Sequence, residues 1–117
     1  MATIRDLVSA IHRRDGVDAV IVLGRDGLVI DSQLDGRTPA DDLAAHVPSI
    51  LGAANELGAA GGLSDLGTAV LEYPGGLAIL STLSPEAVLL VLAQPSPNLG
   101  QLLFELRRNR EHIAALV

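Results

Sequence analysis

Three histidines are the side chains in this chain best suited to hold a metal ion or to act as a general base. His12, His46 and His112 fall on three separate predicted helices, and none has a second histidine at i+4. A zinc site needs several nitrogen, sulfur or carboxylate ligands at one point, and the chain has no cysteine to supply a thiolate. The spacing therefore predicts histidines at the surface or its boundary, and no metal.

Four glycines raise a second option, a loop that binds phosphate. They are Gly58, Gly61, Gly62 and Gly67. A phosphate loop needs Gly-x-x-x-x-Gly-Lys before a helix, whereas this chain contains no lysine and its glycines precede a predicted strand. The chain also lacks the Gly-x-Ser-x-Gly elbow of serine hydrolases. We therefore expect no catalytic residue, no bound cofactor and no enzyme activity of the chain alone.

Length and composition narrow the function classes further. The 117 residues predict one domain, residues 1–117, with a net charge of −6 and only 2% aromatic side chains. Nucleic acids and anionic lipids both attract a surplus of lysine and arginine. The segment Met1–Asp6 does not resemble a signal peptide, and the longest apolar run, Ala87–Ala93, is far shorter than the roughly 20 residues of a spanning helix. We expect a cytoplasmic protein with no nucleic-acid partner and no membrane insertion.

The elements that would position any site follow from periodicity and turn residues. Thr3 with Asp6 three residues later is typical of a helix start, and Asp26-Gly27 between two β-prone runs indicates a hairpin. Thr38 as N-cap and Pro39 as first helical residue indicate the start of a middle helix. The predicted order is αββαβββα, with a helix from Thr3, strands from Val17 and over Leu28–Gln33, a helix over Asp41–Leu57, strands over Leu66–Tyr73, Leu77–Leu83 and Ala87–Ala93, and a final helix from Ser96-Pro97.

The strand from Val17 and the strand Ala87–Ala93 are apolar on both faces, so each must be covered on both sides. The strand Leu28–Gln33 ends in polar residues, as an edge strand does. The middle helix has a core-facing stripe that includes Leu43, Val47, Ile50, Leu51, Ala54 and Leu57. Pro48 lies inside it and cannot be accommodated in a regular helix interior, so the helix either kinks there or breaks into two.

The middle helix carries a second stripe, opposite the first, in which all residues but one are small. This small-residue stripe consists of Ala45, Ser49, Gly52, Glu56 and Ala59. Small side chains let another helix approach closely, which suits a two-fold contact between helices. An alanine-rich face exposed to solvent is the alternative interpretation.

The last predicted helix offers one further candidate site. Phe104 is the only phenylalanine and lies off the apolar stripe of this helix, near Arg107 and Arg108. An apolar side chain among polar ones can anchor a partner, and it can equally pack against the first helix. The arginines form either a positive patch or an ordinary solvated face.

The order and spacing of these patterns resemble the roadblock/dynein light chain family over nearly the whole chain. The resemblance rests on Gly16-Val17, Arg25-Asp-Gly-Leu28, the helix Asp41–Leu57, Ala87–Ala93 and Asn98-Leu-Gly-Gln-Leu102. It implies an α+β fold, a three-layer α/β/α sandwich. Its five-stranded antiparallel sheet would have the order 2-1-5-4-3, with helices 1 and 3 on one face and helix 2 on the other.

The same resemblance implies a homodimer formed through the middle helix and the edge of the third strand. The expected interface is then the small-residue stripe together with Thr68, Val70 and Glu72. It also implies regulation or scaffolding of a Ras-like small GTPase, as in bacterial members of the family. Two alternatives stay open: a small sensory domain with a ligand cavity between sheet and helix, and a purely structural assembly subunit.

Overall fold

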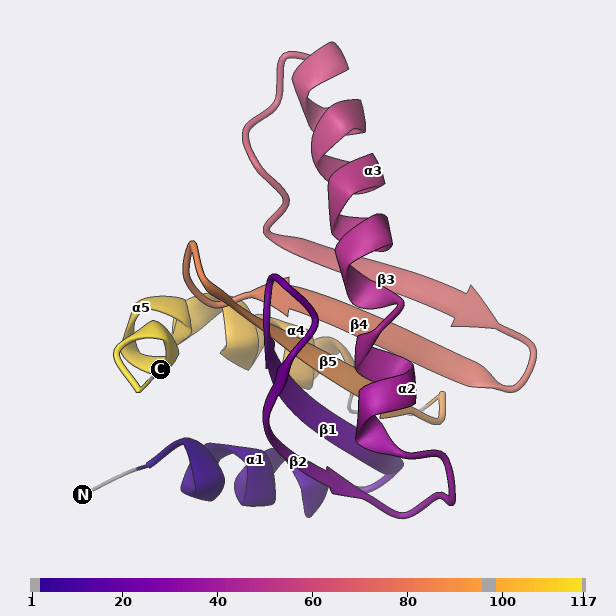
Figure 1. The fold of residues 1–117 in the computed structure, drawn as a ribbon. Coiled ribbons are helices and arrows are strands. Elements are labelled where there is room, and N and C mark those ends of the chain that lie inside the picture. The colour runs from indigo at the N-terminus through magenta and orange to yellow at the C-terminus, as the bar shows by residue number, and fades with distance from the viewer. Residues whose placement is uncertain (1–2, 96–98, 117) are drawn as a thin grey trace.

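The computed structural model describes residues 3–95 and 99–116. Its five strands form one antiparallel sheet in the order β2-β1-β5-β4-β3, with helices on both faces (Figure 1). This confirms the expected α+β fold and strand order. The elements are α1 (Ile4–His12), β1 (Val17–Gly24), β2 (Val29–Leu34), α2 (Ala40–Ala44), α3 (Val47–Ala60), β3 (Thr68–Tyr73), β4 (Gly76–Thr82), β5 (Ala87–Ala93), α4 (Leu99–Arg108) and α5 (Arg110–Ala114).

Thr3 caps α1 as the sequence predicts. Its hydroxyl accepts a hydrogen bond from the Asp6 backbone N–H at 3.2 Å, and the Asp6 carboxylate accepts one from the Thr3 N–H at 2.9 Å. Two amide groups that the helix itself cannot satisfy are thereby paired. The cap fixes where α1 starts, and so which of its faces meets the sheet.

Removing this cap should weaken the fold by a measurable amount. We expect Thr3→Ala to lower the free energy of unfolding by about 1 kcal/mol, because the Asp6 N–H then loses its side-chain acceptor. Urea denaturation of the two proteins measures this difference. Thr3→Ser keeps the hydroxyl and serves as the control, and equal losses in both variants would contradict a role for the hydrogen bond.

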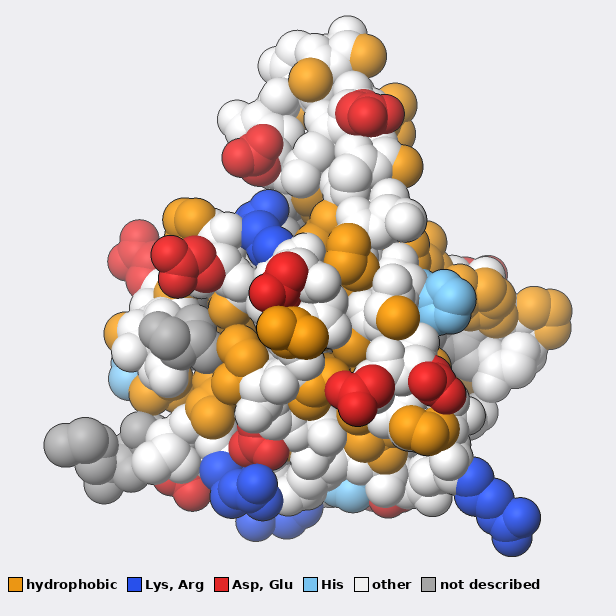
Figure 2. All heavy atoms as spheres, in the orientation of Figure 1, with side chains coloured by type: hydrophobic (Ala, Val, Ile, Leu, Met, Phe, Trp, Pro, Cys, Tyr) orange, Lys and Arg blue, Asp and Glu red, His pale blue; other side chains and the backbone are white. Residues whose placement is uncertain are grey.

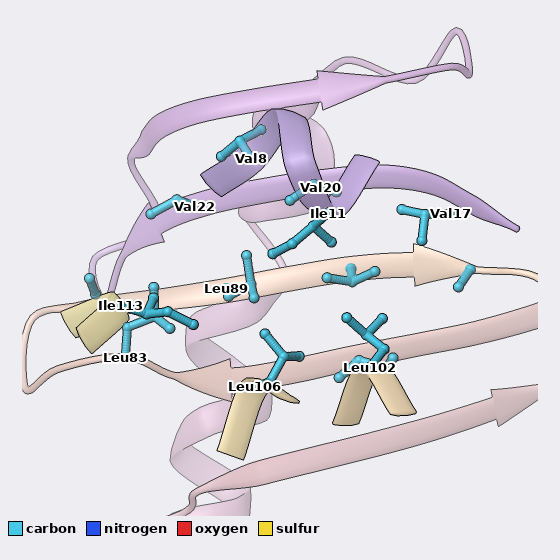
Figure 3. Packing of buried hydrophobic residues seen from close by; sticks show 14 residues of the cluster. Val8, Ile11, Val17, Val20, Val22, Leu83, Leu89, Leu102, Leu106 and Ile113 are labelled. Atoms are coloured by element: carbon cyan, nitrogen blue, oxygen red, sulfur yellow. The ribbon is translucent and has the colours of Figure 1, made fainter. Parts of the chain in front are cut away.

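The two central strands, β1 and β5, are covered on both faces, as their sequences predict. On one face α1, α4 and α5 bury a cluster that includes Val20 and Leu89 (Figure 3). On the other face α2 and α3 bury a cluster that includes Ile21 and Leu90. Consecutive residues of a strand point to opposite faces, so both faces of each central strand contribute to a core.

The middle helix breaks into two rather than kinking. α2 ends at Ala44 and α3 begins at Val47, which makes Pro48 the second residue of α3. A proline is tolerated there because the N–H it lacks would have no partner within the helix. The N-cap of α2 is Pro39; the expectation of Thr38 as cap and Pro39 as first helical residue is wrong by one position.

The last helix also divides, with Asn109 between α4 and α5. The Asn109 side chain donates a hydrogen bond to the Glu105 backbone oxygen at 2.9 Å, which gives the end of α4 a side-chain partner. The predicted start of this helix at Ser96-Pro97 lies outside the described residues. Among the helices of the described part of the chain, none has both the length and the apolar character needed to cross a bilayer.

Candidate functional site

The small-residue stripe forms an exposed surface. Ser49, Gly52, Glu56 and Ala59 lie on α3, and Ala45 is the residue that caps the C-terminus of α2; all five are exposed. Gly52 is open enough that a Cβ built on it would meet no atom within 4 Å apart from its chain neighbours and the nearby backbone of its own helix. Glu56 is the single charged side chain of the stripe. A smooth and nearly uncharged helix face of this kind suits contact with another protein surface.

The second half of α3 projects beyond the edge of the sheet, next to β3 (Figure 1). Leu57 lies on this projection and is 74% exposed, and Leu63 in the loop that follows is 71% exposed. Figure 2 shows orange apolar side chains on the projection. The expectation that Leu57 belongs to the core is wrong, because no part of the sheet lies beneath this end of the helix. The sequence does not mark Leu63 as a site residue. Its place directly after Gly61-Gly62, in a loop, is the one feature that indicates an exposed apolar side chain.

β3 is an edge strand, with β4 as its neighbour on one side. Val70 pairs with Ile79, whose side chain belongs to the cluster beneath α1, α4 and α5. Thr68, Val70 and Glu72 therefore point to that face of the sheet, and Val70 is 42% exposed. An edge strand carries backbone groups that can pair with another strand.

A shallow hollow of about 220 Å³ lies where β3 turns into β4. Tyr73, Ala78 and Leu92 are among the residues that line it. Ala78 and Leu92 belong to the cluster under α2 and α3, so the hollow opens on the same face of the sheet as those helices. Tyr73 is 54% exposed there, and the hollow thus offers an uncovered apolar area beside the edge strand.

Phe104, Arg107 and Arg108 share one exposed face of α4. They follow one another at i, i+3 and i+4, a spacing that brings side chains together on a helix, and all three are exposed. Phe104 is 59% exposed, so most of its surface is open to solvent. The structure thus keeps this face available as a candidate partner-binding surface.

The histidines do not converge. His12 lies at the end of α1, with its Nε2 2.9 Å from the Asp35 carboxylate. His46 precedes α3 and His112 lies on α5. Within residues 3–95 and 99–116, no three His, Asp or Glu side chains form a group that could hold a metal ion.

Comparison with known proteins agrees with this geometry. Residues 3–93 match the Roadblock/LC7 domain family. An uncharacterized protein of Methanocaldococcus jannaschii, MJ0714, is 34% identical over 106 residues, which cover 91% of this chain and 89% of that protein.

Two solved structures share the fold at low identity. A structure described as MglB with tetrameric arrangement superposes with a TM-score of 0.86 at 19% identity, over 97% of this chain and 86% of the other. The gliding protein MglB from Thermus thermophilus superposes with a TM-score of 0.83 at 18% identity, over 97% and 87%. On the family match and the archaeal relative, the chain belongs to the Roadblock/LC7 domain family.

Proposed function

We propose that this single domain acts in the cytoplasm as a homodimeric regulatory or scaffold protein that binds a Ras-like small GTPase. The observation that carries the dimer is the position of α3, which extends past the edge strand with its small-residue stripe and leucines exposed. A second copy related by a two-fold axis can pair its β3 with this β3 and pack its stripe, centred on Gly52, against this one. Thr68, Val70 and Glu72 then lie at the joined edges.

The same arrangement covers the apolar area that each copy leaves open. When two sheets join along β3, the projecting end of each α3 extends over the sheet of the other copy. Leu57 and Leu63 then approach the hollow beside Tyr73, which lies on the face that α2 and α3 occupy. Burying exposed apolar side chains on both partners favours association by about 25 cal/mol per Å². The projection and the hollow are therefore complementary features of one interface.

The proposal of a GTPase partner rests on the resemblance to the roadblock family, whose members serve as regulators or scaffold subunits for small GTPases, and not on any site in this chain. The fold shared with MglB is consistent with this proposal. The proposed action is binding: the dimer selects the GTP-bound conformation of the partner and shifts its equilibrium. The GTPase supplies its own catalytic groups. The rate at which it hydrolyses GTP, or its localisation, changes because the dimer holds it in the GTP-bound conformation.

The direct test is a pull-down of the small GTPases of the source organism by the purified chain. Each GTPase is loaded either with GDP or with a non-hydrolysable GTP analogue, and the mass of the chain in solution is measured in parallel. We expect a dimer that retains one GTPase in the GTP form. A dimer that retains none of them in either form would support a purely structural subunit instead.

The exposed face of α4 is the proposed contact with that GTPase. We expect Phe104→Ala to weaken GTPase binding about tenfold or more, as truncation of an aromatic anchor at the centre of an interface does. Titration calorimetry with the GTP-loaded partner measures the effect. Leu28→Ala is the matched control, because Leu28 is also exposed, at 71%, but lies in the β1–β2 turn. Equal affinities of Phe104→Ala and the unmodified chain would place the contact elsewhere.

A further inference from the structure

A polar pocket of about 370 Å³ opens at the end of the sheet opposite the β3–β4 turn. Three segments meet there: the turn after β1, the turn between β4 and β5, and the loop that leads into β3 (Figure 1). Arg25, Asp65, Thr82 and Ser84 supply its polar lining. Figure 2 shows blue arginine atoms in this region, at the foot of the α3 projection. The pocket is distinct from the small-residue stripe and from the exposed face of α4.

Arg25 is the positively charged group of the pocket, and no carboxylate forms an ion pair with it among the described residues. The side chain is half-buried, and its Nε is fully buried without a hydrogen-bond acceptor. One terminal nitrogen donates to the Ser84 backbone oxygen at 3.3 Å. Within the described part of the chain, no carboxylate forms an ion pair with Arg25, in contrast to Arg5 and Arg14, which pair with Asp31 and Glu105. A buried donor without an acceptor is costly, so the guanidinium lacks part of its usual complement of hydrogen bonds.

Ser84 adds a second donor at the same place. Its hydroxyl oxygen already accepts hydrogen bonds from the backbone N–H groups of Glu86 and Ala87, at 3.1 and 3.0 Å. A hydroxyl carries one proton of its own, and with the oxygen held by two amides this proton is free to point into the pocket. The pocket thus presents the guanidinium of Arg25, one nitrogen of which already donates to the Ser84 backbone oxygen, together with the Ser84 O–H group.

The walls of the pocket are fixed by hydrogen bonds between its three segments. The Arg25 backbone N–H donates to the Glu86 oxygen at 3.1 Å, which joins the two turns. The Thr82 hydroxyl donates to the Leu66 oxygen at 2.7 Å, which joins β4 to the loop before β3. The Leu66 N–H donates to the Asn55 side chain at 2.8 Å, which ties that loop to α3. Donors held in place in this way lose little freedom when a ligand arrives.

We infer that this pocket binds a small molecule through a carboxylate group that Arg25 and Ser84 hold together. The planar fork of an arginine matches the two oxygens of a carboxylate, and a carboxylate offers only acceptors. Asp65 lines the same pocket and is exposed, so its negative charge disfavours ligands with more than one charge. A singly charged carboxylate therefore fits better than a phosphate.

The inference is tested by titrating the ¹⁵N-labelled chain with sodium acetate, sodium phosphate and sodium chloride, each at the same ionic strength. We expect the Arg25 Nε–H signal and the Leu66 and Ser84 amide signals to shift with acetate and to saturate between about 1 and 50 mM, the range for so small a ligand. Phosphate should bind at least several-fold more weakly, and chloride should give no saturation. Absence of saturation with acetate, or equal shifts with chloride, would overturn the inference.

Three variants identify the residue responsible. Arg25→Gln should abolish the saturable shifts, whereas Arg37→Gln, which removes an exposed arginine in the loop before α2, should leave them unchanged. Arg25→Lys keeps the charge but lacks the fork and should bind at least tenfold more weakly; it also serves if Arg25→Gln does not fold. Saturation that survives both changes at Arg25 would show that the carboxylate binds elsewhere.

Discussion

Gly52→Arg should convert the proposed dimer into a monomer without disturbing the fold. Gly52 is the middle residue of the small-residue stripe, and a Cβ built there meets no atom within 4 Å apart from its chain neighbours and the nearby backbone of its own helix. In a two-fold pair, an arginine at this position faces the arginine of the other copy across a closely packed helix contact. Burying charges without partners costs several kcal/mol, which corresponds to a dissociation constant raised by about 100-fold or more. Light scattering after size-exclusion chromatography measures the mass.

The control for this experiment is Gly36→Arg. Gly36 lies in the exposed loop before α2, and a Cβ there also has no atom within 4 Å. The same charge is thus added to the same chain at a place outside the proposed interface, and we expect the dimer mass to be unchanged. The monomer of Gly52→Arg should unfold with an unaltered or slightly higher stability per chain, because arginine favours a helix more than glycine does. A dimer that survives Gly52→Arg would rule out the helix face as the contact.

The sheet could be predicted from sequence because the apolar runs that mark its strands and the turn residues between them are local features that indicate the same topology. β5 occupies the predicted residues, Ala87–Ala93, and β1 starts at the predicted Val17. The Asp26-Gly27 turn joins β1 to β2, with Gly27 at a φ of +92° that favours glycine. Apolar residues on both faces of β1 and β5 required cover on two sides, and that requirement leaves few layer arrangements for a chain of this length.

The helices were less predictable because their ends depend on tertiary context. The sequence alone allowed the middle helix either to kink at Pro48 or to break into two, and the structure shows the break. Leu57 continues the apolar spacing of the core-facing stripe, yet α3 alone has 14 residues and extends about 21 Å after α2 has already crossed part of the sheet, and a sheet of five strands is only about 19 Å wide. The end of α3 therefore overhangs the sheet, and apolar periodicity there predicts contact with something other than this chain's core.

The candidate sites could likewise be predicted from the sequence only where their residues lie close together along the chain. The small-residue stripe could be found from spacing within one helix, and its residues are exposed as a binding face requires. The pocket around Arg25 could not, because its lining comes from three segments that are far apart in the sequence. The sequence indicates only that Arg25 belongs to a hairpin turn. The partial burial of Arg25 and the lack of an acceptor at its Nε depend on contact with the β4–β5 turn, which is distant in the sequence.

Leu89→Ala and Leu80→Ala should destabilise the fold to similar extents, although they affect opposite faces of the sheet. Leu89 on β5 is 0% exposed in the cluster under α1, α4 and α5, and Leu80 on β4 is 1% exposed in the cluster under α2 and α3. Truncating a buried leucine removes apolar burial and leaves a cavity, at a cost of about 2–5 kcal/mol. Since a domain of this size is stable by about 5–15 kcal/mol, either variant should unfold at a much lower urea concentration.

The comparison tests whether both faces of the sheet contribute to stability. Leu28→Ala makes the same truncation at a side chain that is 71% exposed, and it should change the free energy of unfolding by less than about 0.5 kcal/mol. All proteins are measured at one concentration, because dimerisation would add a concentration-dependent contribution. A loss for Leu89→Ala with none for Leu80→Ala would mean that α2 and α3 do not close a core over the sheet. The helix that carries the small-residue stripe would then lack the rigid support that a two-fold contact through Gly52 requires.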